Sequence, residues 1–553
     1  MRRIQTTRPV CGPTAAVIAL KNPEITVNVA DLNAARIRKW NSQHLPVHEP
    51  GLLDVVRAAR NGIKGLTKLD ERTPNLFFTT EVQRCVEEAD LILMSVNTPT
   101  KMTGIGAGSA TNLVSLESAV TSVAQWAKPG AVIVEKSTVP CRTAQMIRQT
   151  LDLHRPGVSF EVLSNPEFLA EGTAIKNLLN PDRILIGSTR TPEGYTAAAA
   201  LKSVYAAWVD PTKIITVNLW SSELAKLVAN AMLAQRISSI NSISAVCEAT
   251  GADINELSYA IGLDTRLGAK FLKAGLGFGG SCFKKDILNL VYMAHSLHLP
   301  EVGEYWLQVL KINDYQRERF VRNVVTRLHS TLMGKKIAIL GWAFKEDTND
   351  TRESPAIEVV KSLLADSPRE IAIYDPGCTP DDMKEEVQQL VATPGQNLLS
   401  PVGPVTICGD ALEACKNANA ILILTPWDQF RFSAKSAKTS AFYDNCQSGK
   451  TSMECQSSGL TAKVQTLAAS MTEPAVAELS CEDDCRECSR GHNEKRTYGG
   501  RIDWEQISES MKKPKWVFDG RGLVDRPNME QLGFRVEAIG QVGLQSKLNG
   551  YDL

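Results

Sequence analysis

The sequence lacks an excess of charge of either sign, because 61 Lys and Arg residues stand against 61 Asp and Glu residues in 553. Nucleic-acid-binding proteins carry a positive surplus to meet phosphates, so we expect no nucleic acid as a partner. Long apolar runs are also missing. The longest, such as Leu91–Val96, have the length of a strand, whereas a membrane-spanning helix needs roughly 20 residues. We therefore expect no membrane association.

A secretory signal and a disulfide pattern are missing as well. The first residues, MRRIQTTRPV, are basic but contain no apolar core. The 13 Cys are mostly scattered singly, which is typical of reduced thiols, so we expect a cytoplasmic protein.

The pattern of apolar residues predicts an α/β protein. Short β-branched runs alternate with helical patterns in the first half, which is typical of a parallel sheet covered by helices. A long stretch of 3.6-residue periodicity follows, and a second α/β pattern begins at KKIAIL. We predict two Rossmann-like doubly wound parallel-sheet domains, 1–218 and 331–553, joined by a long central helical domain, 219–330.

Three polar segments follow predicted strands of the first domain: Asn97–Thr100, Lys136–Thr138 and Asn165–Glu171. Ligands of open α/β sheets bind outside the carboxyl ends of the strands. We expect these segments to converge on one crevice.

The most specific motif runs from Gly275 to Asp286 and reads GLGFGGSCFKKD. Glycines let the backbone approach a ligand closely, and a cysteine at the start of a helix has its thiolate stabilised by free N–H groups. Cys282 and Asp286 then share a helix face. A small buried cysteine in a turn is the alternative, but the glycines and the carboxylate favour a nucleophile.

Other polar residues are spaced for a site. Glu223, Lys226 and Asn230 follow one face of an apolar helix, where they must be paired or functional. An ion pair with a neighbouring helix is the alternative interpretation. Arg352, at the start of a helix, is available for an anion.

These motifs together resemble a known family. The stretches SVNTPT, EKSTVP, SNPEFLAEGTA, SSELAKLVANA, GFGGSCFKKD, GWAFKEDTNDTRES and FDGR are similar to hallmarks of the UDP-glucose/GDP-mannose dehydrogenase family, of the eukaryotic type. The resemblance extends from about Gly12 to Ser433 and again from about Asp503 to Gly540.

The resemblance implies an enzyme that oxidises UDP-glucose to UDP-glucuronate with NAD, in two hydride transfers. It implies that Cys282 forms a thiohemiacetal and then a thioester, with Lys226 and Asn230 around the developing oxyanion. Asp286, with Lys226, is implied as the proton-transfer partner, and Glu167 with Thr138 as the pair that handles the hydrolytic water.

Binding residues are implied in the same way. For NAD they are Asp31, Arg36, Val96, Asn97, Thr98, Pro99, Thr100, Ser137, Glu171 and Arg352. For the substrate they are Glu167, Phe168, Leu169, Ala170, Glu171, Lys226, Asn230, Arg266, Lys273, Gly275, Phe278, Gly279, Lys345 and Arg521. Arg266 resembles a residue supplied to a neighbouring subunit, and homologous enzymes are dimers assembled into hexamers.

The residues leave two alternatives for the function open. In the first, the enzyme acts on another nucleotide sugar, such as GDP-mannose or UDP-N-acetylmannosamine. In the second, the chain is a non-catalytic subunit that binds UDP-sugar without NAD, because the sequence departs from the family at its start. The family's G-x-G-x-x-G turn has no counterpart before Gly12, and Ile4 and Val10 offer poor material for a buried first strand. We expect that strand to be missing, through either a truncated gene model or a real loss of NAD binding.

A second departure is a segment at about 433–498 with weak periodicity, which we expect to be disordered and dispensable. It carries Cys481, Cys485, Cys488 and His492, spaced C-x₃-C-x₂-C-x₃-H, which offers four zinc ligands. The spacing fits no recognised zinc module and acidic neighbours indicate solvent, so we expect a surface loop and no metal site.

Overall fold

The computed structural model describes residues 3–7, 12–47, 49–63, 71–390, 397–432, 476–481, 485, 488 and 500–541. The chain divides into two compact units, each treated separately below. Unit 1 comprises Met1–Ala229, Leu288–Leu297 and Thr451–Glu494, and unit 2 comprises the remainder. Within the part described, no helix is long and apolar enough to cross a membrane.

Unit 1 is built on an eight-stranded sheet in the order β3-β2-β1-β4-β5-β6-β7-β8. The strands are β1 (Arg3–Thr7), β2 (Thr26–Ala30), β3 (Leu76–Thr79), β4 (Leu91–Met94), β5 (Val132–Glu135), β6 (Glu161–Ser164), β7 (Ile184–Ser188) and β8 (Ile214–Asn218). The first six in sequence are parallel, and β7 joins β6 through a single antiparallel pair, Ser164↔Gly187. The predicted α/β class is confirmed, with this reversed edge as an addition.

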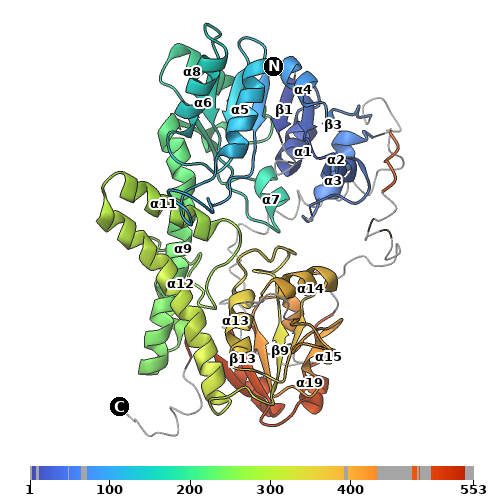
Figure 1. The fold of residues 1–553 in the computed structure, drawn as a ribbon, viewed down its shortest axis with the longest axis vertical. Helices are drawn as coiled ribbons and strands as arrows, with labels where there is room; N and C mark the ends of the chain where they lie inside the picture. Colours follow the sequence, from blue (N-terminus) through green and yellow to red (C-terminus); the bar gives the residue numbers. More distant parts are fainter. Residues whose placement is uncertain are drawn as a thin grey trace. The chain divides into compact units, whose positions relative to one another are not determined.

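The expectation of a missing first strand is wrong. β1 lies in the middle of the sheet and pairs in parallel with β2 and with β4 (Figure 1). Its Ile4 is 1% exposed and belongs to the apolar core. The pairing of both edges of β1 accounts for the strand, because the backbone hydrogen bonds of a central position favour an extended chain even where apolar residues are few.

Helices cover both faces of this sheet, and the strand residues alternate between them. Leu91 and Leu93 of β4 belong to a core beneath α1 (Gly12–Lys21), α3 (Leu52–Arg60) and α8 (Pro192–Tyr205). Ile92 and Met94 belong to the core beneath α4 (Val82–Glu88), α5 (Val114–Trp126) and α6 (Thr143–His154). This period of two is the signature of a doubly wound sheet. The remaining helices are α2 (Ala34–Asn41) and α7 (Ala174–Leu179).

The predicted long helix is confirmed as α9 (Leu219–Thr250), which has 32 residues. It is followed by α10 (Ile254–Gly262), α11 (Phe283–Ser296) and α12 (Pro300–Arg327). Within unit 2, α9 packs on α12, because Ser238 donates a hydrogen bond of 2.7 Å to the Val309 carbonyl and Arg319 pairs with Glu248 (Figure 1).

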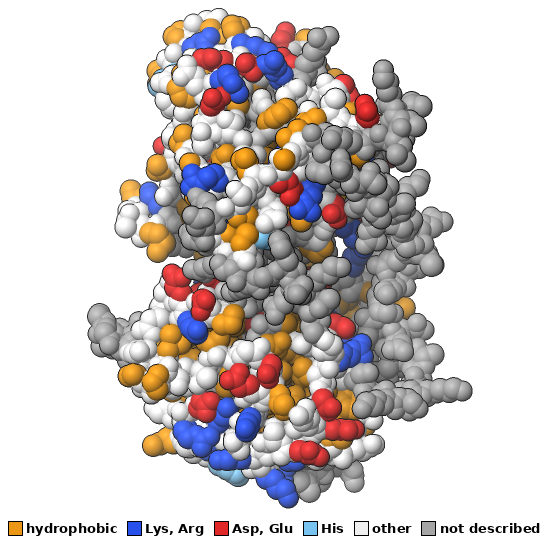
Figure 2. All heavy atoms as spheres, turned by 90° about the vertical axis from the view of Figure 1, so that its right-hand side faces the viewer, with side chains coloured by type: hydrophobic (Ala, Val, Ile, Leu, Met, Phe, Trp, Pro, Cys, Tyr) orange, Lys and Arg blue, Asp and Glu red, His pale blue; other side chains and the backbone are white. Residues whose placement is uncertain are grey.

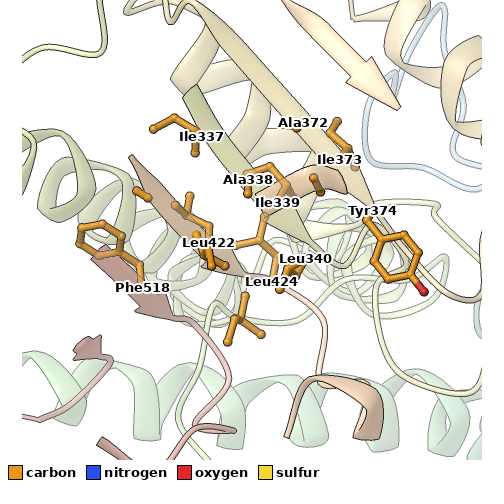
Figure 3. Packing of buried hydrophobic residues seen from close by; sticks show 14 of the residues in the cluster. Ile337, Ala338, Ile339, Leu340, Ala372, Ile373, Tyr374, Leu422, Leu424 and Phe518 are labelled. Atoms are coloured by element: carbon orange, nitrogen blue, oxygen red, sulfur yellow. The ribbon is translucent and has the colours of Figure 1, made fainter. Parts of the chain in front are cut away.

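Unit 2 contains a six-stranded parallel sheet in the order β11-β10-β9-β12-β13-β14. The strands are β9 (Lys336–Leu340), β10 (Glu370–Tyr374), β11 (Val405–Ile407), β12 (Ala420–Ile423), β13 (Trp516–Asp519) and β14 (Arg535–Ala538). The helices after α12 are α13 (Pro355–Leu364), α14 (Pro380–Gln389), α15 (Ala411–Cys415), α19 (Trp504–Ser510) and α20 (Arg526–Gln531). Ile339, Leu422 and Phe518 come from three adjacent strands and gather in one core (Figure 3).

Most of the segment 433–498 lies outside the described residues, but 476–481, 485 and 488 are described. These pack against the rest of unit 1, so the expectation that the whole segment is disordered is wrong for this part. Leu479 forms a bridge with Ser42, and the N–H of Val476 donates to the Asn61 carbonyl at 3.0 Å. Hydrogen bonds to the unit compensate for the weak apolar content.

The surface agrees with the neutral charge balance. On the face shown in Figure 2, acidic and basic side chains are interspersed among the described residues of both units. On this face, therefore, the zero net charge of the sequence corresponds to a local mixture of acidic and basic side chains.

Candidate active site

The loops that follow β4 and β5 in unit 1 are bound to each other. The N–H of Val96 donates to the Ser137 hydroxyl at 2.8 Å, and that hydroxyl donates to the Val96 carbonyl at 2.9 Å. The Thr98 hydroxyl donates to the Thr138 carbonyl at 2.9 Å. The predicted segments 97–100 and 136–138 therefore do meet at the carboxyl edge of the sheet, where such folds bind ligands.

Asp31 follows β2 at the same edge and is 5% exposed. Its carboxylate accepts hydrogen bonds from the Asn33 N–H at 2.9 Å and from Arg36 Nη1 at 2.7 Å. Asn33 in turn caps α2 by accepting from the Arg36 N–H. This turn holds the two predicted NAD ligands of this segment, Asp31 and Arg36, against each other.

Glu167, from the loop after β6, is held by two residues that the sequence did not single out individually. Its carboxylate lies 3.0 Å from Lys136 Nζ and accepts a hydrogen bond of 3.0 Å from the Thr14 hydroxyl. The Lys136 side chain is 3% exposed, and its ammonium also contacts Asn165. The other carboxylate oxygen accepts a hydrogen bond of 3.1 Å from the Phe168 N–H. The side chains that hold Glu167 are thus Lys136 and Thr14, and not its expected partner Thr138. The position of Lys136 directly after β5 was the signal in the sequence that could have identified it as a site residue.

The rest of this loop, Phe168 to Glu171, lies between β6 and α7. Arg183 stacks over the Phe168 ring at 4.1 Å, and Lys226 Nζ lies 5.3 Å from the same ring. The N–H of Ala170 donates to the Asn177 side chain at 3.1 Å. These contacts fix the loop to α7 and α9.

Glu223 has a structural role in the described fold. Its carboxylate accepts hydrogen bonds from the N–H groups of Arg142 and Ala144, at 2.6 and 2.7 Å, at the start of α6. Burial raises its pKa, although these two donors act in the opposite direction. A carboxylate here satisfies free N–H groups of the helix, so the described partners of Glu223 are backbone groups and not the charged side chain of a neighbouring helix.

Cys282 lies in unit 2, immediately before α11, and its thiol is exposed. The glycine loop before it is tightly confined. Asn313 binds both backbone groups of Phe278, accepting at 2.9 Å and donating at 3.1 Å. Gly277 has φ +97, and a Cβ there would lie 2.2 Å from Asn313 Oδ1. Only glycine fits this turn, so the loop presents the cysteine in a fixed place.

Asp286 lies one helical turn after Cys282 and is 1% exposed. Its carboxylate accepts a hydrogen bond of 2.6 Å from the Asn230 side chain of α9, which is also buried. Lys285 Nζ lies 3.5 Å away. The structure therefore brings together Cys282, Asp286 and Asn230 as the sequence predicted, and it adds the hydrogen bond between the last two.

Arg521 follows β13 and points into the same glycine loop. Its Nε donates to the Leu424 carbonyl at 2.6 Å and its Nη1 to the Gly277 carbonyl at 3.2 Å. Among the described residues, its buried Nη2 has no hydrogen-bond partner. Burial lowers the pKa of this guanidinium to about 10, against the opposing charge of Asp519. A buried cationic donor without a partner is costly unless a ligand accepts from it.

Other predicted substrate residues of unit 2 lie around this loop. The Lys345 ammonium lies 5.3 Å from the Phe344 ring, and Phe344 confines Gly280. Lys273 Nζ approaches the Gly522 carbonyl at 3.5 Å. Gly275 approaches the Gly520 carbonyl so closely that a Cβ would lie 3.1 Å from it.

Two predicted arginines are directed to nearby carboxylates. Arg352 Nε lies 2.8 Å from Asp350, although its backbone carbonyl accepts from the Gly280 N–H at 3.0 Å. Arg266 is paired with Asp264 at 2.6 Å, and 88% of its side chain is exposed. The structure therefore places Arg352 beside the glycine loop and Arg266 on the surface.

Comparison with known proteins matches this arrangement to one family. Three family models cover the chain: the NAD binding domain of the UDP-glucose/GDP-mannose dehydrogenase family over residues 9–209, its central domain over 220–315 and its UDP binding domain over 338–447. UDP-glucose 6-dehydrogenase 2 of Arabidopsis thaliana is 45% identical over 538 residues, which are 96% of this chain and 95% of that protein. UDP-glucose 6-dehydrogenase 1 of rice, Oryza sativa subsp. japonica, is 46% identical over 539 residues, with the same coverage.

Solved structures agree. A UDP-glucose dehydrogenase from Pyrobaculum islandicum superposes with a TM-score of 0.64 at 28% identity, covering 78% of this chain and 91% of that one. A UDP-D-ManNAc dehydrogenase from Pyrococcus horikoshii, at 20% identity, shares the fold with a TM-score of 0.66, covering 98% and 99%. With the two doubly wound sheets, the long α9 and the cysteine at the glycine loop, these matches show that the chain belongs to the UDP-glucose/GDP-mannose dehydrogenase family.

Proposed function

We propose that this chain oxidises C6 of UDP-glucose to a carboxylate with NAD⁺, giving UDP-glucuronate. The observation that carries the proposal is Cys282, exposed at the start of α11 behind a loop whose Gly277 and Gly279 leave no room for a Cβ. Asp286 and Asn230, joined at 2.6 Å, lie one turn further along α11 and on α9. The close similarity to plant enzymes named UDP-glucose 6-dehydrogenase supports the choice of sugar.

The carboxyl edge of the unit 1 sheet fits NAD. Asp31 is the acidic residue after the second strand that such folds use for a ribose, and the linked loops at Val96–Thr100 and Ser137 continue the edge beside it. Glu171, and Arg352 from unit 2, complete the set implied by the family. Bound NAD⁺ supplies a hydride acceptor, twice for each substrate molecule. The chain's own residues do the rest.

Cys282 supplies the covalent step. The C6 alcohol first loses a hydride and its hydroxyl proton, which gives an aldehyde. The sulfur of Cys282 then loses its own proton and adds to the aldehyde carbon, and the aldehyde oxygen gains a proton, giving a thiohemiacetal. Loss of the C6 hydride and the hydroxyl proton then converts this adduct to a thioester. Water attacks the thioester carbon, and the thiol leaves as the carboxylate forms. The cysteine is regenerated unchanged.

Asp286, Asn230 and Lys226 handle the oxygen on C6. We assign proton transfer to Asp286 together with Lys226, and stabilisation of the developing negative charge to Lys226 and the amide of Asn230. The hydrogen bond from Asn230 to Asp286 orients both groups before substrate binds. The assignment of Lys226 follows the family's pattern.

Glu167 and Thr138 are assigned to the hydrolytic water. The ion pair of Glu167 with buried Lys136 adds a positioning residue, because it holds the carboxylate at the end of β6. The Thr14 hydroxyl, at the start of α1, donates to the same carboxylate oxygen.

Arg521 is the strongest support for the nucleotide half of the substrate. Its partnerless Nη2 lies next to the loop that carries Gly275, Phe278 and Gly279, and diphosphate oxygens are strong acceptors for such a donor. We assign Lys345 and Lys273 to the same ligand, and Phe168, Leu169 and Ala170 to the sugar. GDP-mannose and UDP-N-acetylmannosamine remain the competing substrates.

Assembly and location are part of the proposal. We assign Arg266 to the site of a neighbouring copy, because its side chain is 88% exposed, and we expect dimers assembled into hexamers. We place the protein in the cytoplasm.

The test is steady-state NADH production with UDP-glucose, GDP-mannose and UDP-N-acetylmannosamine. We expect UDP-glucose to be preferred and Cys282→Ser to abolish turnover. The half-buried thiol of Cys141 provides a control, since Cys141→Ser should remain active.

Glu167→Gln should slow hydrolysis, so a covalent adduct on Cys282 should accumulate in rapid-quench mass spectrometry. Normal turnover by Cys282→Ser would contradict the mechanism, and absence of NAD⁺ binding in calorimetry would favour the non-catalytic subunit.

A further inference from the structure

Three cysteines of the late segment converge on a histidine near the start of the chain. The sulfur atoms of Cys481, Cys485 and Cys488 lie 3.3, 3.4 and 3.4 Å from His44 Nδ1. The four potential ligand atoms all lie within 4.8 Å of one another. All four residues belong to unit 1. From this arrangement we infer that His44, Cys481, Cys485 and Cys488 bind a structural Zn²⁺ ion that fastens the late segment to the NAD-binding unit.

Hydrogen bonding does not explain the arrangement. One ring nitrogen carries either one hydrogen or one lone pair, so it satisfies one sulfur and not three at equal distance. Disulfides do not explain it either, because all three cysteines are free. Four ligands around one ion do explain it. With Zn–S of about 2.3 Å and Zn–N of about 2.0 Å, the N···S edge of a tetrahedron is about 3.5 Å.

The donor set selects the metal. Three thiolates and one imidazole in a tetrahedral arrangement are typical of zinc, whereas magnesium and calcium prefer oxygen. Four protein ligands also leave no open position for water or substrate, so the site is structural and not catalytic. None of its four ligands is among the residues assigned to the oxidation.

Further contacts hold the ligands in place independently of a metal. His44 follows α2 in a turn where its N–H donates to the Ser42 hydroxyl at 3.2 Å. Gln43 Nε2 lies 3.7 Å from the Cys488 sulfur, and Cys485 is buried. A donor to a ligating sulfur is the kind of outer contact that tunes metal sites.

The chain just before Cys481 is anchored by one carboxylate. Glu478 Oε1 accepts from Arg57, Arg60 and Asn61 at 2.7, 2.7 and 3.2 Å, and its Oε2 accepts from Arg57 at 2.9 Å. Arg60 is 8% exposed. Such a charge-assisted cluster positions the segment three residues before the first cysteine ligand. It therefore pre-organises the site.

The fourth ligand differs from the one that spacing indicates. The sequence offers His492, which lies outside the described residues, whereas the geometry selects His44, 437 positions before Cys481. The expectation of no metal rested on the poor fit of the linear spacing to known modules. That argument fails when one ligand comes from another part of the chain.

The test is the zinc content of the full-length purified chain, measured by plasma mass spectrometry after desalting. We expect one zinc per chain, lost in His44→Ala and in each of Cys481→Ser, Cys485→Ser and Cys488→Ser. The matched control is His492→Ala, which should keep its zinc. Retention of zinc by His44→Ala with loss in His492→Ala would overturn the assignment of the fourth ligand.

A second measurement covers the case in which a variant fails to fold. The wild-type chain is stripped with a chelator and titrated with Co²⁺, and the expected result is the intense d–d absorption of tetrahedral cobalt with a thiolate charge-transfer band. A chelator should also lower the melting temperature of the wild type and not that of His44→Ala. Absence of stoichiometric zinc together with absence of the thiolate–cobalt bands would refute the site, as would cysteines found as disulfides in the freshly purified chain.

Discussion

Glu135 is the last residue of β5, and its carboxyl group is 1% exposed, with no hydrogen-bond partner for Oε1 within the described structure. Burial, followed by the charge of Glu223, raises its pKa well above the ordinary value. An acid whose pKa is raised on folding binds its proton more tightly in the folded state. Its contribution to stability is full below the unfolded pKa, about 4.3, and is lost as the pH rises through the folded pKa.

We predict that Glu135→Gln, which keeps a neutral group of the same size, removes this loss. The free energy of unfolding of the wild type should fall relative to the variant as the pH rises above about 5, by at most ~1.4 kcal/mol per pH unit for one proton. Denaturant unfolding at a series of pH values measures the difference. Glu117→Gln, on the exposed side of α5, is the control and should leave the curve unchanged. Parallel curves for wild type and Glu135→Gln would show that the carboxyl group titrates normally.

Single residues also mark the limit of sequence reasoning at the site. The pair Cys282 and Asp286 was predictable, because both lie on one short motif whose helical spacing is visible. The contact between Lys136 and Glu167 joins two segments that the sequence did predict to meet. Thr14 and His44 were not predictable as partners, because each contacts a residue far away in sequence: Thr14 and Glu167 are 153 positions apart, and His44 and Cys481 are 437 apart. Contact between distant positions is a property of the fold.

At the level of elements, the packing of α1 against α2 depends on the absence of a side chain. Gly12 begins α1, and a Cβ there would lie 2.2 Å from two ring atoms of Trp40. Trp40, on α2, is fully buried and stacks on Phe78 of β3 at 4.9 Å with an interplanar angle of 8°. A flat ring sandwiched in this way has no room to withdraw.

We predict that Gly12→Ala destabilises unit 1 by about 1–3 kcal/mol, the usual result of overpacking, despite the better helix propensity of alanine. Thermal unfolding measures the loss. The control is Gly500→Ala, where a Cβ meets nothing within 4 Å. In the double variant with Trp40→Phe the two losses should be less than additive, because the smaller ring removes the collision; additive losses would place the strain elsewhere.

β1 shows why one element escaped prediction. Its sequence, RIQTT, has a single apolar residue, Ile4, and periodicity arguments need several. The central place between β2 and β4 is instead determined by pairing on both edges. The strands on either side, TVNVA and LILM, were recognisable because each contains several apolar residues, which indicate a buried strand. Propensity yields to tertiary pairing where the rest of the sheet is already specified.

At the scale of the whole molecule, one face of α9 carries apolar side chains that are exposed to solvent in the single chain. Met232, Ile243 and Val246 are 51%, 39% and 53% exposed, and their spacing of 11 and 3 places them on one helix face. Tyr259 of α10 and Leu263 after it add 40% and 66% exposed apolar side chains. Clustered exposed apolar residues mark an interaction surface, and a second copy of the chain is the partner that we propose.

We predict that the wild-type chain has a solution mass of two or more chains of 60.4 kDa each and that Val246→Glu reduces the number of chains in the assembly. A carboxylate placed in an apolar self-contact is repeated on the symmetry-related copy, so each interface gains two buried charges without partners. Light scattering after size-exclusion chromatography measures the mass. Leu153→Glu is the control: Leu153 is 79% exposed on α6, outside this face, and the variant should assemble like the wild type. An unchanged mass for Val246→Glu would remove this face of α9 from the interface, and a wild-type mass equal to one chain would refute the proposed assembly.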